Sequence, residues 1–327
     1  MTTQVFATRL NGDERMAMVE TVFLTAVALI GLALVQRQDR GPATGGAGRK
    51  GTAPRGRAPG GRGGQAALTA LCWLLALLLL LPHLTLLLLS FVPAGTWTVE
   101  TLPPAYTTRN YLALISEPER LRPLMNSLWM AAAATAGAVA LALLAAGLTA
   151  RRPSRAGRAV QGLMVLPWAV PGTVFAIALA TTFGVHRPWA GRVVLIGTLW
   201  LLPLAYLIRN LPIAGRAILA GARALDPSLP EAAASLGAGR WRTLRRVTLP
   251  LLRPAIAAGA TLAFATAVGD FVTSIVLYTY DTRPLALEIL ASLRSSDVGV
   301  AAAYGVFLMV ISGLVFALGG ERETVTT

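Results

Sequence analysis

Seven apolar stretches dominate the sequence, at residues 16–35, 67–92, 124–149, 160–183, 193–210, 255–278 and 299–319. Each is close to the roughly 20 residues that an α-helix needs to cross the hydrocarbon core of a bilayer. Charged residues make up only 13% of the chain, against about 25% in a soluble domain. The sequence therefore predicts an all-α, polytopic membrane protein, and it excludes an ordinary cytosolic enzyme.

The residue types that most often build metal and redox sites are scarce. Cys72 is the only cysteine, and the two histidines, His83 and His186, are far apart in the sequence. A single cysteine excludes an internal disulfide and a cysteine-based metal cluster. No phosphate-loop sequence is present either. We therefore expect no metal, no cofactor and no nucleotide site. The seven spans leave no room for a large extramembrane catalytic domain, so we do not expect an enzyme.

The charges are distributed unevenly between alternate loops. With the N-terminus outside, the inside segments carry 20 basic and five acidic residues, and the outside segments carry nine of each. Basic residues concentrate on the cytoplasmic side of membrane proteins. This asymmetry predicts an outside N-terminus and a cytoplasmic C-terminus. It also accounts for the net charge of +14 without a nucleic-acid partner.

Residues 36–66 form a segment of a different kind. The segment holds ten Gly, three Pro and seven Arg or Lys, and it has no Leu, Ile, Val or aromatic residue. Such a composition cannot bury enough apolar surface to fold. We expect a disordered basic linker between a first apolar span, within residues 1–35, and the remaining six spans, within 67–319; residues 320–327 are a tail.

The loop at 211–254 contains a short helix signal. Ser228 and Glu231 have the spacing of a capping box, and the alanines that follow favour a helix of about 230–239. Gly237 and Gly239 end it, and we expect Gly237 in the left-handed conformation. A short rigid helix on the cytoplasmic side is suited to docking in a groove of a partner. The alternative is an ordinary interfacial amphipathic helix.

This loop carries a specific motif. It reads Glu231-Ala232-Ala233, three residues, Gly237, nine residues, Val247, one residue, Leu249-Pro250. The pattern resembles the EAA signature of ABC-importer permease subunits, with Val247 in place of the usual Ile. The resemblance covers roughly 67–319 and implies a six-span permease core in a bacterial inner membrane. It also implies that the short helix docks on a separate ATP-binding subunit, which hydrolyses the ATP. The implied partners are a second permease half and an extracytoplasmic substrate-binding protein.

Three further segments resemble the ferric-iron-type permeases within that family. They are LPWAVPG at 166–172, Gly269-Asp270-Phe271, and RPLALEILASL at 283–293. The resemblance implies ferric iron as the substrate. Sugar, thiamine and phosphonate importers remain alternatives, because nothing in the outside loops identifies a solute.

The extra first span matches the end of the chain. Residues 4–24 align without a gap over 288–308, with Asp13 over Asp297 and Val22-Phe23-Leu24 over Val306-Phe307-Leu308. Internal repeats are common in transporters. We therefore interpret 1–35 as the end of a preceding permease half and the chain as the C-terminal part of a fused permease. DNA upstream of Met1 should then encode five more spans and a second EAA loop. The alternative is an unrelated signal-anchor helix.

Asp270, Gly269, Pro167 and Pro171 are the candidate residues of a translocation path. Asp270 is the only acidic residue deep in a core span, and an intramembrane charge usually faces a cavity or a partner. Its alternative role is an internal hydrogen bond to Thr266, Thr273 or Ser274. The two prolines should break or bend their helix.

Two other classes of function compete with an importer subunit. An ion-coupled secondary transporter usually needs several intramembrane ionisable groups, and this chain offers Asp270 and little else. A membrane-anchored nucleic-acid-binding protein would need aromatic side chains for stacking, which the basic linker lacks.

Overall fold

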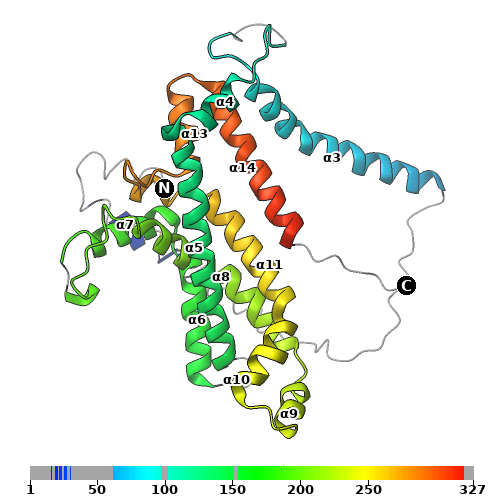
Figure 1. Cartoon of the computed structure of the whole chain (residues 1–327), viewed down its shortest axis with the longest axis vertical. Coiled ribbons are helices and arrows are strands. Elements are labelled where there is room, and N and C mark those ends of the chain that lie inside the picture. The colour runs from blue at the N-terminus through cyan, green and yellow to red at the C-terminus, as the bar shows by residue number, and fades with distance from the viewer. Residues whose placement is uncertain are drawn as a thin grey trace.

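The computed structural model describes residues 62–96, 102–149, 154–186 and 188–319, together with separate positions between 16 and 30. The first predicted span and the linker fall almost wholly outside these residues. The described residues form helices joined by loops, and none of them forms a strand (Figure 1). Its helices are α3 (Arg62–Ser90), α4 (Arg109–Ser116), α5 (Pro118–Thr149), α6 (Arg155–Ala169), α7 (Gly172–Phe183), η1 (Pro188–Ala190), α8 (Leu201–Ala224), α9 (Ser228–Ser235), α10 (Arg240–Thr243), η2 (Leu244–Thr248), α11 (Leu249–Val268), α12 (Ser274–Leu277), α13 (Leu285–Arg294) and α14 (Val298–Gly319).

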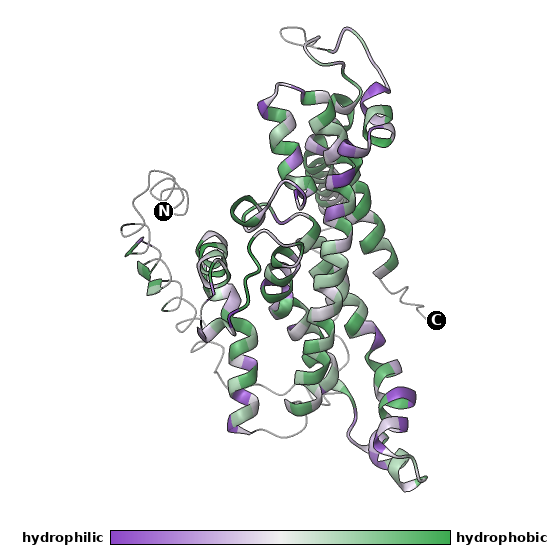
Figure 2. Ribbon diagram, turned by 60° about the vertical axis from the view of Figure 1, so that its left-hand side comes forward, coloured by the Kyte–Doolittle hydropathy of each residue, from purple (hydrophilic) through white to green (hydrophobic). Residues whose placement is uncertain are grey.

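Four of the described helical segments are long and apolar enough to cross a membrane: most of α3, α5, the continuous run from α10 to α11, and α14. The pair α6 and α7 counts as a fifth if it is one span, bent by 106°. α8 has 24 residues but contains arginines, and it is not among the apolar candidates. Polar residues gather towards the two ends of the long helices, and apolar residues fill their middles (Figure 2). The predicted all-α, polytopic fold is confirmed.

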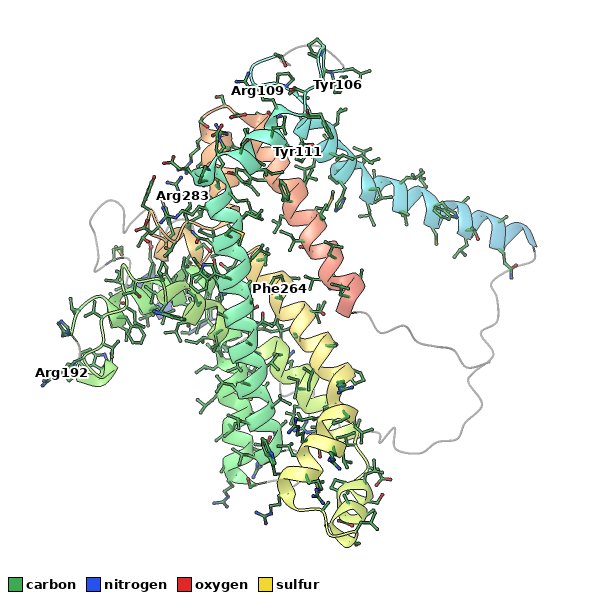
Figure 3. All side chains as sticks on the ribbon, viewed as in Figure 1. Tyr106, Arg109, Tyr111, Arg192, Phe264 and Arg283 are labelled. Atoms are coloured by element: carbon green, nitrogen blue, oxygen red, sulfur yellow. The ribbon has the colours of Figure 1, made fainter. Side chains whose placement is uncertain are left out.

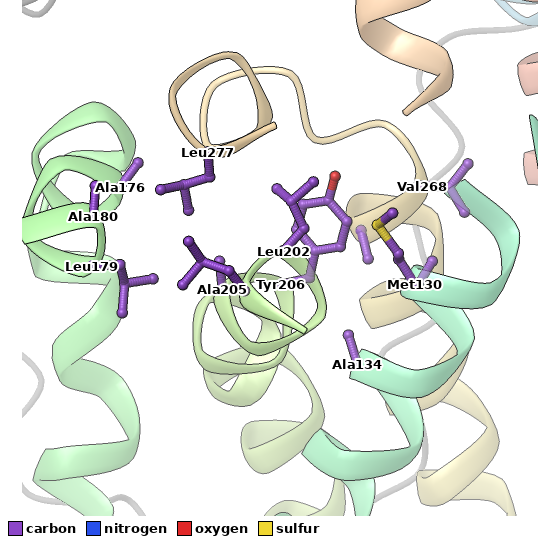
Figure 4. Close-up of a cluster of buried hydrophobic side chains, with 13 residues drawn as sticks. Met130, Ala134, Ala176, Leu179, Ala180, Leu202, Ala205, Tyr206, Val268 and Leu277 are labelled. Carbon is purple, nitrogen blue, oxygen red and sulfur yellow. The ribbon is translucent and has the colours of Figure 1, made fainter. Parts of the chain in front are cut away.

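The centre of the bundle is formed by α5, α8 and α11. Close packing there depends on small residues, as it commonly does between membrane helices. A β-carbon on Gly137 of α5 would lie 2.4 Å from Cδ1 of Leu207 on α8. One buried cluster joins α5, α7, α8, α11 and α12 around Tyr206, which is 1% exposed (Figure 4). This cluster holds the two shorter helices, α7 and α12, against the long ones.

Helix α3 stands away from the bundle and meets α14 near one end of each (Figure 1). None of its most apolar window is buried, and leucines such as Leu79 are largely exposed. In a bilayer this surface faces lipid or another protein.

Three boundaries differ from the sequence-based expectation. Helix α8 begins at Leu201 and continues to Ala224, so residues 211–224 are helical and the loop is shorter than 211–254. Helix α3 begins at Arg62, inside the expected linker. The span expected at 255–278 is interrupted, because α11 ends at Val268 and α12 begins at Ser274.

Candidate functional site

The short helix of the EAA loop is α9, and its C-terminal end has a defined geometry. The Gly237 N–H donates to the Ala234 carbonyl at 2.9 Å, and the Ala238 N–H donates to the Ala233 carbonyl at 3.0 Å. This pair of bonds is a Schellman motif. Gly237 has φ +81°, so the predicted left-handed end of the helix is confirmed. Gly239 has φ −65° and instead precedes α10.

The predicted capping box is wrong. Pro227 is the N-cap residue and already has helical dihedrals, so Ser228 is the first residue of the helix and makes no side-chain cap. Asp226 takes that role, since its Oδ1 accepts the Ser228 N–H at 2.9 Å. This backbone hydrogen bond, with a second one from the Ser228 hydroxyl, lowers the pKa of Asp226. Helix α9 therefore spans 228–235 rather than about 230–239.

The EAA loop presents an open surface at one end of the bundle (Figure 1). None of the residues in α9, α10 and η2 is buried. Leu236 is 89% exposed and Trp241 is 73% exposed, and Glu231 also lies on the exposed surface. A groove of about 770 Å³ separates α9 from α5, with Ala234 on one wall and Leu143 on the other. Exposed apolar side chains on a short rigid helix are suited to contact with another protein.

The end of the EAA motif connects α9 to α11. Val247 lies in η2, a single π-helical turn, and Leu249 and Pro250 begin α11. All three residues are half-buried. Because η2 continues into α11 without a break, the loop is joined directly to a helix of the central bundle. A single π-turn within a helix often marks a functional position.

Two breaks in the spanning helices meet near the middle of the bundle. Pro167 lies inside α6 and Pro171 is the N-cap of α7, and the bend of 106° between these helices confirms the predicted effect of the prolines. The second break follows α11, where Gly269 is the C-cap and Asp270 is the next residue.

Arg209 of α8 connects these two breaks. Its Nε lies 3.5 Å from Oδ2 of Asp270, and a β-carbon on Gly172 would lie 2.7 Å from its Nη1. The Trp168 indole N–H donates to the Arg209 backbone carbonyl at 3.2 Å. The sequence placed Arg209 at the edge of the inside loop, so its role was missed. The available signal was an arginine inside the apolar run 193–210.

Asp270 makes the internal hydrogen bonds that the sequence offered as its alternative role, and it also contacts Arg209. Its carboxylate accepts hydrogen bonds from the Thr273 N–H at 2.7 Å and from the Thr273 hydroxyl at 3.1 Å. The Ser274 hydroxyl donates to the Asp270 backbone carbonyl. Thr266 bonds Asn210 instead, at 2.6 Å. The side chain of Asp270 is 10% exposed, so a nearly buried carboxylate is shared between Arg209 and Thr273, the N-cap residue of α12.

The opposite end of the bundle carries a charged pocket of about 490 Å³ between α5 and α13. Arg122 pairs with Asp281 at 2.7 Å, and Arg283 pairs with Glu288 at 3.0 Å. Arg283 lies at this end together with Arg109 and Tyr111 of α4 (Figure 3). The segment RPLALEILASL thus forms most of α13 and supplies part of this pocket. Among the described residues, no three His, Cys, Asp or Glu side chains form a group that could hold a metal ion.

Residues 138–320 match the family model described as "Binding-protein-dependent transport system inner membrane component". That match includes the whole EAA loop and both helix breaks. The chain belongs to this family. This is a family of transport components and not a family of enzymes.

Several permeases are similar to this chain. A probable ABC transporter permease, y4fN, of Sinorhizobium fredii is 32% identical over 78% of this chain and 45% of its own length. A putative ABC transporter permease, ORF1, of Streptomyces antibioticus is 35% identical over 68% of this chain and 96% of its own. The ferric transport permease FbpB of Actinobacillus pleuropneumoniae is 31% identical over 58% of this chain and 27% of its own. The chain thus spans less than half the length of y4fN and FbpB.

Solved structures support the same fold. A bacterial ABC transporter involved in the import of alginate matches with a TM-score of 0.61 at 20% identity, over 78% of this chain and 94% of its own. A second alginate transporter structure, in complex with a periplasmic protein bound to alginate pentasaccharide, matches with a TM-score of 0.62 at 18% identity, over 80% of this chain and 96% of its own.

Proposed function

We propose that this chain is the membrane-spanning permease subunit of an ATP-driven importer, and that a separate ATPase subunit docks on α9. The observation that carries the proposal is the geometry of α9: a short exposed helix, ended by a Schellman motif and joined through η2 to the central helix α11. A helix with fixed ends can transmit a displacement, whereas a loosely held loop absorbs it. The chain itself provides no ATP hydrolysis in this proposal.

The translocation path is proposed at the two helix breaks. Pro167 and Pro171 shape the bend of α6 and α7, and Gly269 and Asp270 follow the end of α11. Backbone that leaves helical geometry at membrane depth is tolerated where it is buried in protein or lines a cavity. Arg209 supports this location, because it places a second charge next to Asp270.

The orientation and the remaining partners follow from the charge distribution and the family. The α9 end is proposed to face the cytoplasm, with the N-terminus outside. The opposite end, with α4 and α13, is then available to an extracytoplasmic substrate-binding protein. A second permease half completes the path, and residues 1–35 are proposed as the remnant of a preceding half. The exposed apolar surface of α3 is consistent with contact to such a half or to the bilayer.

Ferric iron is the solute that the sequence resemblance favours, and FbpB is named for ferric transport. Other relatives are named for molybdenum and for sulfate transport. The solved transporters that share the fold import the polysaccharide alginate, so the names of the relatives leave the choice of solute open. The charges along α8 bear on that choice.

The α9 proposal is tested with paired substitutions. Glu231→Ala removes an exposed charge from the first turn of α9, and Gly237→Asp places a side chain at φ +81°. Each change costs on the order of 1 kcal/mol locally, too little to unfold a polytopic protein. Gly239→Ala is the control, since φ is −65° there and a β-carbon would meet nothing within 4 Å.

Membrane insertion, co-purification of the ATPase and uptake are measured on the same preparations. We expect Glu231→Ala and Gly237→Asp to insert normally but to bind the ATPase loosely or lose its stimulation by substrate. Gly239→Ala should behave as wild type. Wild-type uptake in both test variants would reject the docking role and leave α9 as an interfacial helix.

A further inference from the structure

Three arginines lie at seven-residue intervals along α8: Arg209, Arg216 and Arg223. Seven residues make almost two full turns, so the three side chains project from one face of the helix. We call this set the arginine row. It runs from the middle of the bundle to the α9 end of α8.

Each member of the row contacts α6 or the beginning of α7. The Arg223 Nη2 donates to Gln161 Oε1 at 2.8 Å. The Arg216 guanidinium carbon lies 5.2 Å from the centroid of the Trp168 ring. Arg209 reaches Gly172, the first residue of α7. The row therefore follows the bent helix pair from the open end of the bundle to the break.

The position of Arg209 is not explained by the usual preference for basic residues at cytoplasmic helix ends. That preference accounts for Arg223, which lies in the last turn of α8. Arg209 lies 15 residues before Ala224, which corresponds to about 22 Å along the helix axis. A guanidinium stays protonated at any accessible pH. At this depth, a permanent cation usually faces a polar pathway.

The positive charge of the arginine row is only partly balanced by neighbouring carboxylates. Asp270 lies 3.5 Å from Arg209, but the recorded partners of Arg216 and Arg223 are the neutral side chains of Trp168 and Gln161. Within the described parts of the chain, neither of these two arginines forms an ion pair. The face therefore presents three guanidinium groups against one carboxylate.

The deep end of the row has unused hydrogen-bond donors. Arg209 contacts Asp270 through Nε, while its two Nη groups make no hydrogen bond to the described residues. Helix α7 begins at Gly172, and a β-carbon there would lie 2.7 Å from Nη1, so the helix N-terminus begins beside this guanidinium. In the same turn, Thr173 is 9% exposed, and its buried hydroxyl has no hydrogen-bond partner among the described residues. A guanidinium fork next to a helix N-terminus matches the geometry of an oxyanion.

We propose that the arginine row lines the α9-side half of the translocation path and admits an anionic solute, with Arg209 as the deepest binding group. Asp270 is the counter-ion that holds Arg209 when no solute is present. The inference rests on the proposed importer function and narrows it to oxyanions and anionic chelates. A ferric ion fits this path only when its ligands give the complex a net negative charge, because three guanidinium groups repel a free trivalent cation.

The test is uptake by cells that express the full chain with its native partner subunits. The labelled anions are sulfate, molybdate, phosphate and ferric citrate, with maltose and thiamine as the neutral and cationic solutes. The variants are Arg209→Gln, Arg209→Lys and Arg216→Gln. Arg253→Gln on α11 is the matched control, since this exposed arginine lies outside the row and forms no hydrogen bond or ion pair with the described part of the chain.

We expect the wild type to import at least one of the anions. Arg209→Gln should raise KM for that anion by at least about tenfold, the usual effect of losing a charged hydrogen bond. Arg209→Lys should give a KM between those of the wild type and Arg209→Gln, because lysine keeps the positive charge but lacks the two parallel N–H donors of the guanidinium. Arg216→Gln should weaken uptake without disturbing Asp270, and Arg253→Gln should match wild type.

Two results would overturn the inference while leaving the importer function intact. In the first, the wild type co-purifies with the ATPase but imports none of the anions, whether or not it imports maltose or thiamine. The other is unchanged anion kinetics in both Arg209→Gln and Arg216→Gln. Loss of the ATPase partner from the wild type would instead count against the proposed function itself. If Arg209→Gln inserts poorly, the double variant with Asp270→Asn removes the unpaired carboxylate, and Arg216→Gln still tests the row.

Discussion

Gly172 and Arg209 approach so closely that a β-carbon on the glycine would lie 2.7 Å from Nη1 of the arginine. The same β-carbon would lie 3.0 Å from Cγ1 of Val272. The guanidinium end is flexible, but in this position it is also held beside Asp270. The absence of a side chain at residue 172 therefore allows α7 to begin directly against the Arg209–Asp270 pair.

Gly172→Ala should displace the Arg209 guanidinium and lengthen its contact with Asp270. We expect a loss of stability on the order of 1 kcal/mol, typical of mild overpacking, together with impaired uptake. Gly162→Ala in α6 is the control, because a β-carbon there meets nothing within 4 Å. Thermal unfolding in detergent and uptake in cells are the measurements. Equal behaviour of the two variants would contradict the close approach of α7 to Arg209.

Asp270→Ala should abolish or strongly reduce uptake. The change leaves Arg209 without its counter-ion and the Thr273 N–H without its acceptor. Leaving a buried donor without its acceptor costs about 1–3 kcal/mol, and the loss of the counter-ion adds to that cost. Asp270→Asn keeps an oxygen that can accept the Thr273 N–H but removes the negative charge. It therefore separates the effect of this hydrogen bond from the effect of the ion pair with Arg209. Uptake is compared at equal amounts of inserted protein; normal uptake in Asp270→Ala would remove this residue from the path.

Gly237→Ala should loosen the end of α9, whereas Gly239→Ala should not. Both positions have room for a β-carbon, so the difference is conformational: φ is +81° at Gly237 and −65° at Gly239. A non-glycine residue in the left-handed region costs about 1 kcal/mol. Hydrogen–deuterium exchange of the Ala238 amide reports the Schellman bond directly. Equal exchange in the two variants would show that the left-handed end is not maintained by Gly237.

The N-terminal end of α9 should weaken in acid. Hydrogen bonds from Ser228 lower the pKa of Asp226 below its ordinary value of 3.8. A depressed folded-state pKa stabilises the helix above the ordinary value, and that contribution is lost as the pH falls through the lowered pKa. Below this pH the protonated Asp226 is a poorer acceptor for the Ser228 N–H, and α9 should exchange faster.

Two variants distinguish this cap from a general effect of acid. Asp226→Asn should keep α9 protected across the whole pH range, because asparagine also caps helices but does not titrate. Asp226→Ala should leave α9 loose at every pH. Exchange is corrected for the intrinsic pH dependence of the amide rate. An acid-induced loss of protection that persists in Asp226→Asn would assign it to another group.

Local features of the molecule could be predicted from residue order alone. The lengths of the apolar runs require helices that span a bilayer, since no other element satisfies its own backbone there. The EAA spacing identified the exposed helix, and Gly237 identified its end, because only a residue without a β-carbon enters the left-handed region cheaply. The bend at Pro167 and Pro171 follows from the missing amide hydrogens of proline. Each of these consequences depends on a few neighbouring residues.

Contacts between distant segments could not be predicted in this way. Asp226 rather than Ser228 caps α9, because the dihedrals of Pro227 place Ser228 inside the helix. α8 extends well past the end of its apolar run, and there Arg216 and Arg223 contact Trp168 and Gln161 of α6. Arg209 and Asp270 are 61 positions apart in the sequence. Only the packing of α8 against both helix breaks brings them within 3.5 Å, since a charge pair at membrane depth depends on which helices are neighbours and not on the order of residues within either one.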